Sequence, residues 1–228
     1  MSASAARRLR DNGLGLAFGA LFVVTLAAES VVGLADFNGE QRAAGLHAIG
    51  YADYVLSSAF AVDVMENWQS EFLQFLLYIV ATVWLVQRGS PESKDAEDVG
   101  TESDEKQLVG PYARPDSPAW ARAGGWRLSV YSRSLGLVMG SIFLLSWFAQ
   151  SLTGAVAYSE EQMRSLQDPV SWGEYVRLPD FWDRTLQNWQ SELLAVASMV
   201  VLSIYLRQRG SPESKPVGTP HGSTSVSG

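Results

Sequence analysis

The chain alternates between long apolar runs and polar connectors. Residues 14–35 include one charged residue, Glu29, whereas residues 72–86, 135–157 and 193–206 include none. Charge-free stretches of this length, flanked by Trp, Tyr and Arg, are typical of membrane-spanning helices. The pattern therefore predicts an all-α integral membrane protein, in which four spans form a four-helix bundle.

The same arrangement of residues occurs twice. The pentapeptide Asn-Trp-Gln-Ser-Glu occupies residues 67–71 and 188–192, and the octapeptide Gln-Arg-Gly-Ser-Pro-Glu-Ser-Lys occupies residues 87–94 and 208–215. Both pairs are offset by 121 residues, which indicates a tandem duplication. Each repeat is expected to form a hairpin of two spans, and two parallel hairpins would make the bundle.

The order of these runs predicts how the chain is organised. We expect a cytoplasmic N-terminal arm (1–13), two repeats (14–94 and 119–215) joined by an acidic cytoplasmic linker (95–118), and a disordered tail (216–228). The first repeat has spans at about 14–35 and 67–86 around an extracytoplasmic loop (36–66). The second has spans at about 135–157 and 188–206 around an extracytoplasmic loop (158–187).

Basic residues predict the orientation of the spans. Of the 17 lysines and arginines, 13 lie in the N-terminal arm, in the connector between the repeats, or after the last span. Short connectors rich in Lys and Arg remain in the cytoplasm. Both termini are therefore expected to be cytoplasmic.

The pentapeptide is expected to belong to the second helix of each repeat. Residues 72–86 alone would rise about 22 Å, which is short of a hydrocarbon core of roughly 30 Å. Adding residues 67–71 closes this gap. The Trp of the pentapeptide would then lie near the membrane interface, where amphipathic rings anchor helices.

Local signals predict where other helices begin and end. At Asn38 and Ser159, a Gln follows three residues later, which is the spacing of a capping box and predicts that a short helix starts at each. Gly89 and Gly210 are expected to end the long helices in a left-handed conformation. The Ser-Pro-Glu that follows each glycine predicts the first turn of a new short helix.

Composition and charge exclude several classes of function. The net charge of −7 is concentrated in the linker, as expected for a solvated, flexible segment. The lack of cysteine excludes disulfides, thiolate metal sites and a Cys nucleophile. His47 and His221 fit no metal-ligand pattern, and no cluster of polar residues indicates hydrolysis. We expect no metal, no cofactor, no enzymatic activity and no binding of nucleic acid.

A layer of polar side chains is expected in the outer third of the membrane. Helix rise places Glu29 about 22 Å above Leu14, which is the depth expected for the pentapeptides, and Gln150 is the counterpart of Glu29. Residues three and four apart share one face of a helix. The candidate site residues are Glu29, Asn67, Ser70, Glu71, Gln150, Asn188, Ser191 and Glu192.

This polar layer has three interpretations. The side chains could hydrogen-bond between helices and hold the hairpins together. They could form a cation, proton or ligand site, because ionisable groups in a membrane are costly unless they are paired or hydrated. The third interpretation is a site for a protein partner.

Glycines at helical spacing predict a close helix contact. Gly15 and Gly19 are four residues apart, as are their counterparts Gly136 and Gly140. This spacing allows two helix backbones to approach closely. We expect packing between the first and third spans, and a homo-oligomer contact is the alternative.

Several motifs together resemble one known family. They are Leu9-Arg10-Asp11-Asn12-Gly13-Leu14, Gln150-Ser151-Leu152-Thr153-Gly154, Tyr158-x-Glu160-Glu161-Gln162, and both copies of the pentapeptide and octapeptide. The chain resembles an uncharacterised bacterial family of membrane proteins, domain of unknown function 6766, over nearly all of its length outside the linker and tail. The first repeat departs from the pattern, with Glu29 where the second has Gln150. The resemblance implies the fold and a place in the bacterial inner membrane, and it implies no activity.

Two classes of function follow from these observations. The first is a non-enzymatic membrane scaffold or accessory protein, whose outer loops or cytoplasmic linker bind a membrane protein partner. The second is a small oligomeric channel or transporter that uses the polar layer. Four spans are few for an autonomous transporter, so the sequence favours the first class. In both, the lipid bilayer is the expected surrounding.

Overall fold

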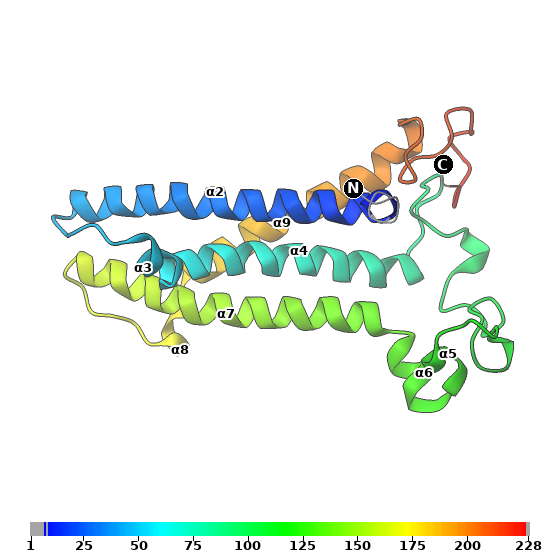
Figure 1. The fold of residues 1–228 in the computed structure, drawn as a ribbon, viewed down its shortest axis with the longest axis horizontal. Coiled ribbons are helices and arrows are strands. Elements are labelled where there is room, and N and C mark those ends of the chain that lie inside the picture. The colour runs from blue at the N-terminus through cyan, green and yellow to red at the C-terminus, as the bar shows by residue number, and fades with distance from the viewer. Residues whose placement is uncertain (1–6, 8, 227–228) are drawn as a thin grey trace. The chain divides into compact units, whose positions relative to one another are not determined.

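The chain folds into helices joined by loops (Figure 1). The computed structural model describes residue 7 and residues 9–226, and every regular element in these ranges is helical. The all-α prediction is therefore confirmed. Four long helices are α2 (Gly13–Ala43), α4 (Ser58–Trp84), α7 (Ser134–Arg164) and α9 (Pro179–Tyr205).

Short helices occupy the connectors between the long ones. A helix of one or two turns precedes each of the last three long helices, and two 3-10 turns lie in the acidic linker. These elements are α3 (Tyr51–Val55), η1 (Ala96–Asp98), η2 (Gly110–Tyr112), α5 (Ala119–Ala123), α6 (Gly125–Tyr131) and α8 (Trp172–Tyr175).

The described chain divides into two compact units. Unit 1 holds the residues up to Val64 together with Leu152–Trp172, and unit 2 holds Met65–Ser151 together with the residues from Gly173 onward. The helices α4 and α7 each contribute residues to both units. Each unit is described by itself below.

In unit 1, the loops that follow α2 and α7 are tied to these helices. Asn38 lies inside α2, and its side chain bonds both the N–H and the carbonyl of Ile49, at 2.8 and 3.1 Å. The counterpart Ser159 lies inside α7 and bonds the N–H and the carbonyl of Val170, both at 3.1 Å. The predicted capping boxes are therefore wrong, because these side chains bond the returning loop and the long helices continue to Ala43 and Arg164.

A buried tyrosine packs between α2 and the start of α4. Tyr54 of α3 is only 3% exposed and lies between the rings of Phe37 and Phe60, with centroids 5.6 and 5.4 Å away. A Cβ atom at Gly33 would lie 2.2 Å from the Tyr54 hydroxyl, so a glycine is required at this contact. Burial raises the pKa of Tyr54, and the carboxylates of Asp63 and neighbouring acids add to this effect.

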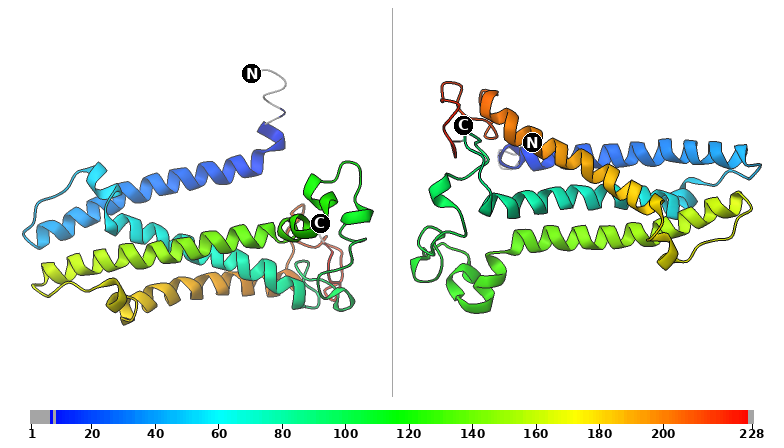
Figure 2. Two further views of the ribbon diagram at one scale, coloured as in Figure 1. Left: turned by 90° about the horizontal axis from the view of Figure 1, so that it is seen from below. Right: turned by 180° about the vertical axis from the view of Figure 1, so that it is seen from behind.

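In unit 2, α4 and α7 run side by side, and α9 runs obliquely to both of them (Figures 1 and 2). The buried aromatic residues of this unit include Phe143 of α7, Tyr175 of α8 and Phe181 of α9. Tyr175 and Phe181 pack edge to face with centroids 5.7 Å apart. Tyr175 is the counterpart of Tyr54, and it too is buried and packs against a Phe ring.

The helices α4 and α9 end earlier than predicted. Their last residues are Trp84 and Tyr205, five residues before Gly89 and Gly210. Both glycines do have left-handed backbone angles, with φ of 87° and 82°, but they lie in the turn that follows the helix. The conformation was predicted correctly and its place relative to the helix end was not.

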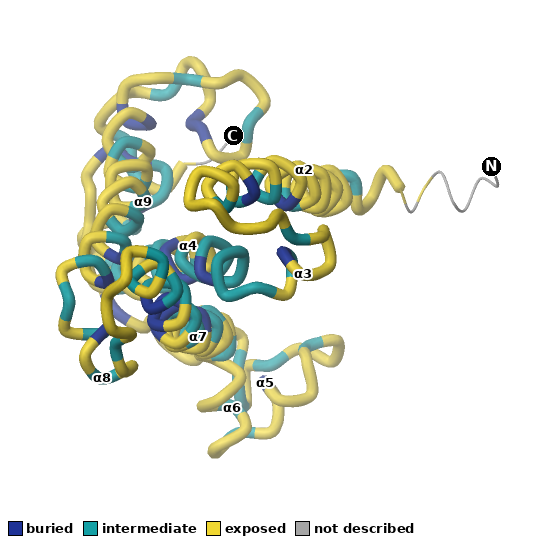
Figure 3. The backbone as a smooth tube through the Cα atoms, turned by 90° about the vertical axis from the view of Figure 1, so that its left-hand side faces the viewer, coloured by how far each residue is buried: buried dark blue, intermediate teal, exposed yellow. Residues whose placement is uncertain are grey.

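Two of the long helices have the length and composition of a membrane span. They are α2 and α7, with mean hydropathy of 2.0 and 1.6 over their most apolar 18 residues. Of those residues, only 6% in α2 and 22% in α7 are buried, and most of α2 is exposed in Figure 3. Every stretch of that length within α4 or α9 includes the polar pentapeptide, which lowers its mean hydropathy.

Candidate functional site

The first pentapeptide provides a buried polar side chain to unit 2. Gln69 of α4 has no exposed surface, and its amide nitrogen donates to the carbonyl of Glu66 at 3.1 Å. Its amide oxygen accepts a hydrogen bond of 2.7 Å from the indole N–H of Trp189, in the second pentapeptide. A buried indole N–H needs such an acceptor, because an unpaired donor would carry a desolvation penalty.

Aromatic rings from α7 surround Trp189. Its ring centroid lies 6.3 Å from that of Phe143 and 5.7 Å from that of Trp147. The indole N–H of Trp147 donates to the hydroxyl of Thr185 at 3.4 Å, and Thr185 is completely buried. The three helices α4, α7 and α9 therefore meet at this point of unit 2.

An ion pair lies one turn further toward the start of α9. Arg184 contacts Glu66 at 3.2 Å and Asp180 at 3.5 Å. Burial by itself lowers the pKa of Arg184, but these two carboxylates outweigh it and leave the pKa raised. Asp180 also accepts a hydrogen bond of 3.2 Å from Tyr175, whose pKa is raised by burial and by that carboxylate. We call Glu66, Gln69, Trp147, Arg184, Thr185 and Trp189 the junction cluster.

Several predicted site residues bond within their own helix. Ser70 is buried and donates to the carbonyl of Asn67 at 2.9 Å. Ser191 donates to the carbonyl of Asn188 at 2.8 Å, and the Asn188 amide donates to the carbonyl of Arg184 at 2.9 Å. Their hydrogen bonds therefore stabilise single helix turns.

The other members of the predicted layer lie in different surroundings. Glu71 and Glu192 are close enough for their carboxylates to repel each other. Gln150 is completely buried. Glu29 belongs to unit 1 and is exposed, while its neighbour Ser30 is buried and shares a hydrogen bond of 2.8 Å with the hydroxyl of Tyr51.

The glycine motifs differ from one another in their contacts. A Cβ atom at Gly140 would lie 3.6 Å from the side chain of Leu76, so this glycine of α7 faces α4. At Gly15, Gly19 and Gly136, a Cβ atom would meet no described residue within 4 Å. Contact between the first and third spans through these glycines stays a prediction.

The two octapeptides form the same hydrogen-bonded turn. The N–H of Gln87 donates to the hydroxyl of Ser93 at 2.8 Å, and the N–H of Gln208 donates to the hydroxyl of Ser214 at 2.9 Å. A second bond, from the N–H of the Glu to the hydroxyl of the first Ser, is 3.2 Å long in both copies. These bonds join atoms within one motif, so the motif alone can specify its turn.

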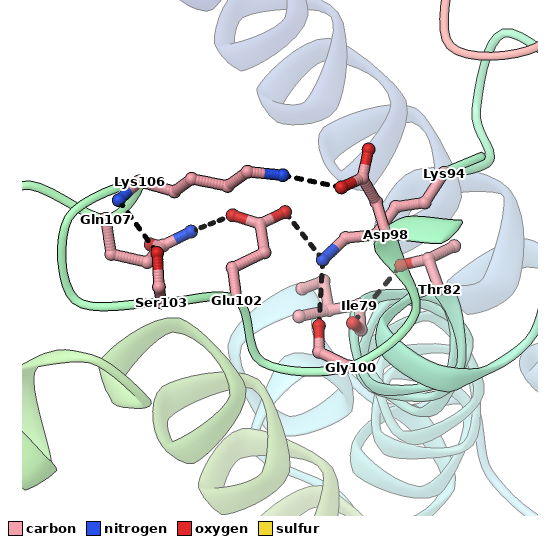
Figure 4. A network of polar contacts seen from close by, with 9 residues as sticks. All are labelled: Ile79, Thr82, Lys94, Asp98, Gly100, Glu102, Ser103, Lys106 and Gln107. Atoms are coloured by element: carbon pink, nitrogen blue, oxygen red, sulfur yellow. Dashed lines mark hydrogen bonds and ion pairs between the residues drawn. The ribbon is translucent and has the colours of Figure 1, made fainter. Parts of the chain in front are cut away.

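The lysine that ends the first octapeptide pairs with the acidic linker (Figure 4). Lys94 donates to the carbonyl of Gly100 at 3.0 Å and to the carboxylate of Glu102 at 2.8 Å. Its hydrogen bond lowers the pKa of Glu102. Nearby, Lys106 contacts Asp98 at 2.5 Å. The linker thus neutralises part of its own charge.

The lysine that ends the second octapeptide is buried among carbonyl oxygens. Lys215 is 1% exposed, and its ammonium group donates to the carbonyls of Gly89, Pro220, His221 and Ser223, at 2.5, 3.4, 2.9 and 3.1 Å. Three of these carbonyls belong to the tail and one to the first octapeptide. This ammonium group therefore joins the ends of both repeats.

The described part of the tail makes two backbone contacts with the first octapeptide. The hydroxyl of Thr224 accepts a 3.0 Å bond from the N–H of Gly89, and the N–H of Ser225 donates to the carbonyl of Ser90 at 3.3 Å. These contacts and Lys215 join the described part of the tail to the first octapeptide. Disorder of the tail in solution, expected from its Gly, Ser, Thr and Pro content, stays a prediction.

The carboxyl groups of the two octapeptides also meet. Glu92 accepts a hydrogen bond of 2.8 Å from the hydroxyl of Tyr78 and interacts with Glu213. Burial raises the pKa of Glu92, and Glu213 adds to this rise although the Tyr78 bond opposes it. We call this meeting of both octapeptides and the tail the octapeptide junction.

Comparison with known families agrees with the motifs. The family described as "Domain of unknown function (DUF6766)" matches residues 5–226. The chain belongs to this family. No curated protein and no solved structure matches the chain. Membership thus covers both repeats, the linker and most of the tail, and it brings no activity with it.

Proposed function

We propose that the chain is a non-enzymatic scaffold of the bacterial inner membrane, with four spans and both termini in the cytoplasm. The observation that carries this proposal is the apolar surface of α2, where mean hydropathy is 2.0 and only 6% of the most apolar stretch is buried. Exposed apolar surface of this extent is unfavourable in water and is matched by lipid.

The polar contacts of unit 2 support a structural role for its interior. The side chains of the junction cluster bond one another across α4, α7 and α9, through Glu66–Arg184, Gln69–Trp189 and Trp147–Thr185. In a water-filled path these groups would be solvated instead of paired with one another. The contacts therefore favour a sealed bundle over a small oligomeric channel or transporter.

A scaffold also needs surfaces for partners. The outer loops are held in place by Asn38 and Ser159, and the acidic linker is held by Lys94 and Lys106. We propose these segments as the binding surfaces for a membrane protein partner. A rigid loop loses less conformational entropy on binding than a flexible one.

Cysteine labelling tests the membrane topology. The natural chain has no cysteine, so single Leu46→Cys, Leu166→Cys and Ser103→Cys variants each carry one reactive thiol. In cells whose outer membrane has been permeabilised, a maleimide that cannot cross the inner membrane should label the exposed positions 46 and 166. Position 103 should react only after the inner membrane is opened.

Two results would contradict the proposal. Labelling of position 103 from the outside would place the linker outside the cytoplasm. Release of the full-length protein from membranes by alkaline carbonate would show that it does not span them. In that case the apolar surface of α2 would need a protein cover.

A further inference from the structure

The segment before α7 has an unusual set of exposed side chains. In α5 and α6, the indoles of Trp120 and Trp126 are 42% and 67% exposed, although their ring centroids lie only 5.7 Å apart. Val130 and Tyr131 are each 41% exposed. Such residues are normally removed from water by packing or by a partner.

The charge of the same segment is entirely positive. Arg122, Arg127 and Arg133 are all exposed, and the sequence contains no Asp or Glu from residue 117 to residue 159. Arg127 lies 5.7 Å from the ring centroid of Trp126, and Arg133 donates to the carbonyl of Ser129 at 3.0 Å. Neither contact neutralises a positive charge.

In the acidic linker just before this segment, charged side chains of opposite sign are paired with one another. Two of its carboxylates are already paired, because Lys94 at the end of the octapeptide contacts Glu102 and Lys106 of the linker contacts Asp98 (Figure 4). In the described part of the chain, no ion pair joins the linker to the arginines of α5 and α6. The positive charge of the segment is therefore available to an outside partner.

The position of the segment along the chain restricts that partner. The helix α6 ends at Tyr131 and α7, a helix long and apolar enough to cross a membrane, begins at Ser134. From Tyr131 to Leu135 the backbone can extend by at most about 14 Å. A headgroup region is roughly 5–8 Å deep on each side of the hydrocarbon core. Once α7 is inserted, the segment lies at the surface of the bilayer.

We propose that α5 and α6 form an interfacial anchor that binds anionic lipid headgroups. Trp126 and Val130, four residues apart, lie on one face of α6 and enter the interface, as amphipathic aromatic and apolar side chains do. The three arginines bind the phosphates of anionic lipids, to which guanidinium groups donate paired hydrogen bonds. This inference rests on the proposed membrane location and adds the class of lipid that is bound.

A single fluorescent label on the full-length protein tests this anchor. The Val130→Cys variant, labelled with an environment-sensitive dye, is placed in lipid nanodiscs of phosphatidylcholine alone or of phosphatidylcholine with phosphatidylglycerol. Acrylamide, a neutral quencher in water, then measures the exposure of the label. Added phosphatidylglycerol should reduce quenching, and high salt should restore it, because salt screens the attraction.

Removal of the arginines gives the main comparison. The Arg122→Gln/Arg127→Gln/Arg133→Gln variant of the labelled protein should remain quenched in both lipids. An arginine near an anionic surface contributes about fivefold to binding, so the ratio of docked to undocked segment should fall about a hundredfold. A label at Ser103→Cys, in the acidic linker, is the control and should be quenched equally in both lipids.

A second label separates this inference from the proposed function. Val24 is 65% exposed in the middle of α2, so a Val24→Cys label should be shielded from acrylamide in every lipid. If position 24 is shielded but acrylamide quenching at position 130 is the same with and without phosphatidylglycerol, the proposed anchor is wrong. The exposed side chains of α5 and α6 would then bind a protein partner. Quenching at position 24 would overturn the membrane location and the anchor with it.

Discussion

Each of the two motifs occurs twice in surroundings that differ, and the pentapeptides differ in burial between the two copies whereas the octapeptides keep the same turn. Gln69 has no exposed surface whereas its counterpart Gln190 is exposed. Trp68 is 37% exposed, while Trp189 is half-buried and packs against the rings of α7. The pentapeptides are therefore identical in sequence and different in burial.

The octapeptides keep their local structure in both places. The bonds from Gln87 to Ser93 and from Gln208 to Ser214 differ in length by only 0.1 Å. Their surroundings differ, because Lys94 contacts the carboxylate of Glu102 whereas Lys215 donates only to carbonyls, and because Ser90 is buried whereas Ser211 is partly exposed. A motif that satisfies its own backbone groups keeps its shape, whereas a side chain on a helix surface is buried or exposed according to its neighbours.

The largest difference between the two copies is expected for the lysines that end the octapeptides, Lys94 and Lys215. Lys215→Met leaves four carbonyls without their donor and should reduce the free energy of opening of the tail by about 3 kcal/mol. Lys94→Met removes a partly exposed ion pair and should reduce the free energy of opening of the linker by about 1 kcal/mol or less. Hydrogen–deuterium exchange of residues 216–226 and 95–107 measures both. Equal losses would show that Lys215 is no more buried in solution than Lys94.

The pentapeptides should differ almost as much. Gln69→Leu keeps the size of the side chain but leaves the N–H of the half-buried Trp189 without an acceptor, which should destabilise the protein by about 2 kcal/mol. Gln190→Leu changes an exposed position and should have an effect within about 0.5 kcal/mol. Thermal unfolding in detergent compares them. An equal loss in both variants would contradict the asymmetric packing of the two copies.

The octapeptide turns should respond equally to equal changes. Ser93→Ala and Ser214→Ala each remove the hydroxyl that accepts the N–H of a glutamine, at a cost of about 1 kcal/mol in each turn. Amide exchange at Gln87 and Gln208 should increase by similar factors. A loss confined to one copy would mean that its surroundings, and not the motif, stabilise that turn.

The smallest effect concerns pH at the octapeptide junction. The pKa of Glu92 is raised in the folded protein by burial and by Glu213. A carboxyl group with a raised pKa binds its proton more tightly when folded, so the junction is most stable below the ordinary pKa of 4.5 and weakens as pH rises through the raised value. Amide exchange at Gly89 should therefore speed up over this range, beyond the intrinsic effect of pH.

The Glu92→Gln variant provides the control for this pH effect. It keeps a hydrogen-bonding side chain but cannot ionise, so protection of Gly89 should no longer weaken as pH rises. Glu97→Gln, an exposed acid of the linker, should behave like the natural protein. A pH response that survives Glu92→Gln would assign the effect to another group.

The sequence was sufficient for the class of fold and for the left-handed glycines of the octapeptides, whereas the short helix predicted after each glycine is a turn instead. The apolar runs predicted the long helices, and the glycines of the octapeptides predicted left-handed conformations, because both signals are local. The extension of α2 and α7 past Asn38 and Ser159 was missed, since those side chains bond loop residues eleven positions away. A capping box and a helix-to-loop bond use the same residue types.

The candidate site was harder to predict for a related reason. Helix periodicity selected Asn67, Ser70 and Glu71 as one polar face and left out Gln69, which bonds to Trp189 across helices. Its burial depends on where α9 places Trp189, which no local pattern reveals. The one available signal was the invariance of the whole pentapeptide between the two copies, which includes Gln69 and the Trp.

Ion and proton flux into liposomes tests the scaffold account most directly. Liposomes with the purified protein should show no flux above that of empty liposomes, and the Glu71→Gln/Glu192→Gln variant should be equally silent. Because both charges are removed, the repulsion between these carboxylates is lost, and that variant should be no less stable than the natural protein. Flux through the natural protein that disappears in a folded Glu71→Gln/Glu192→Gln variant would contradict the account and make the polar layer a transport site.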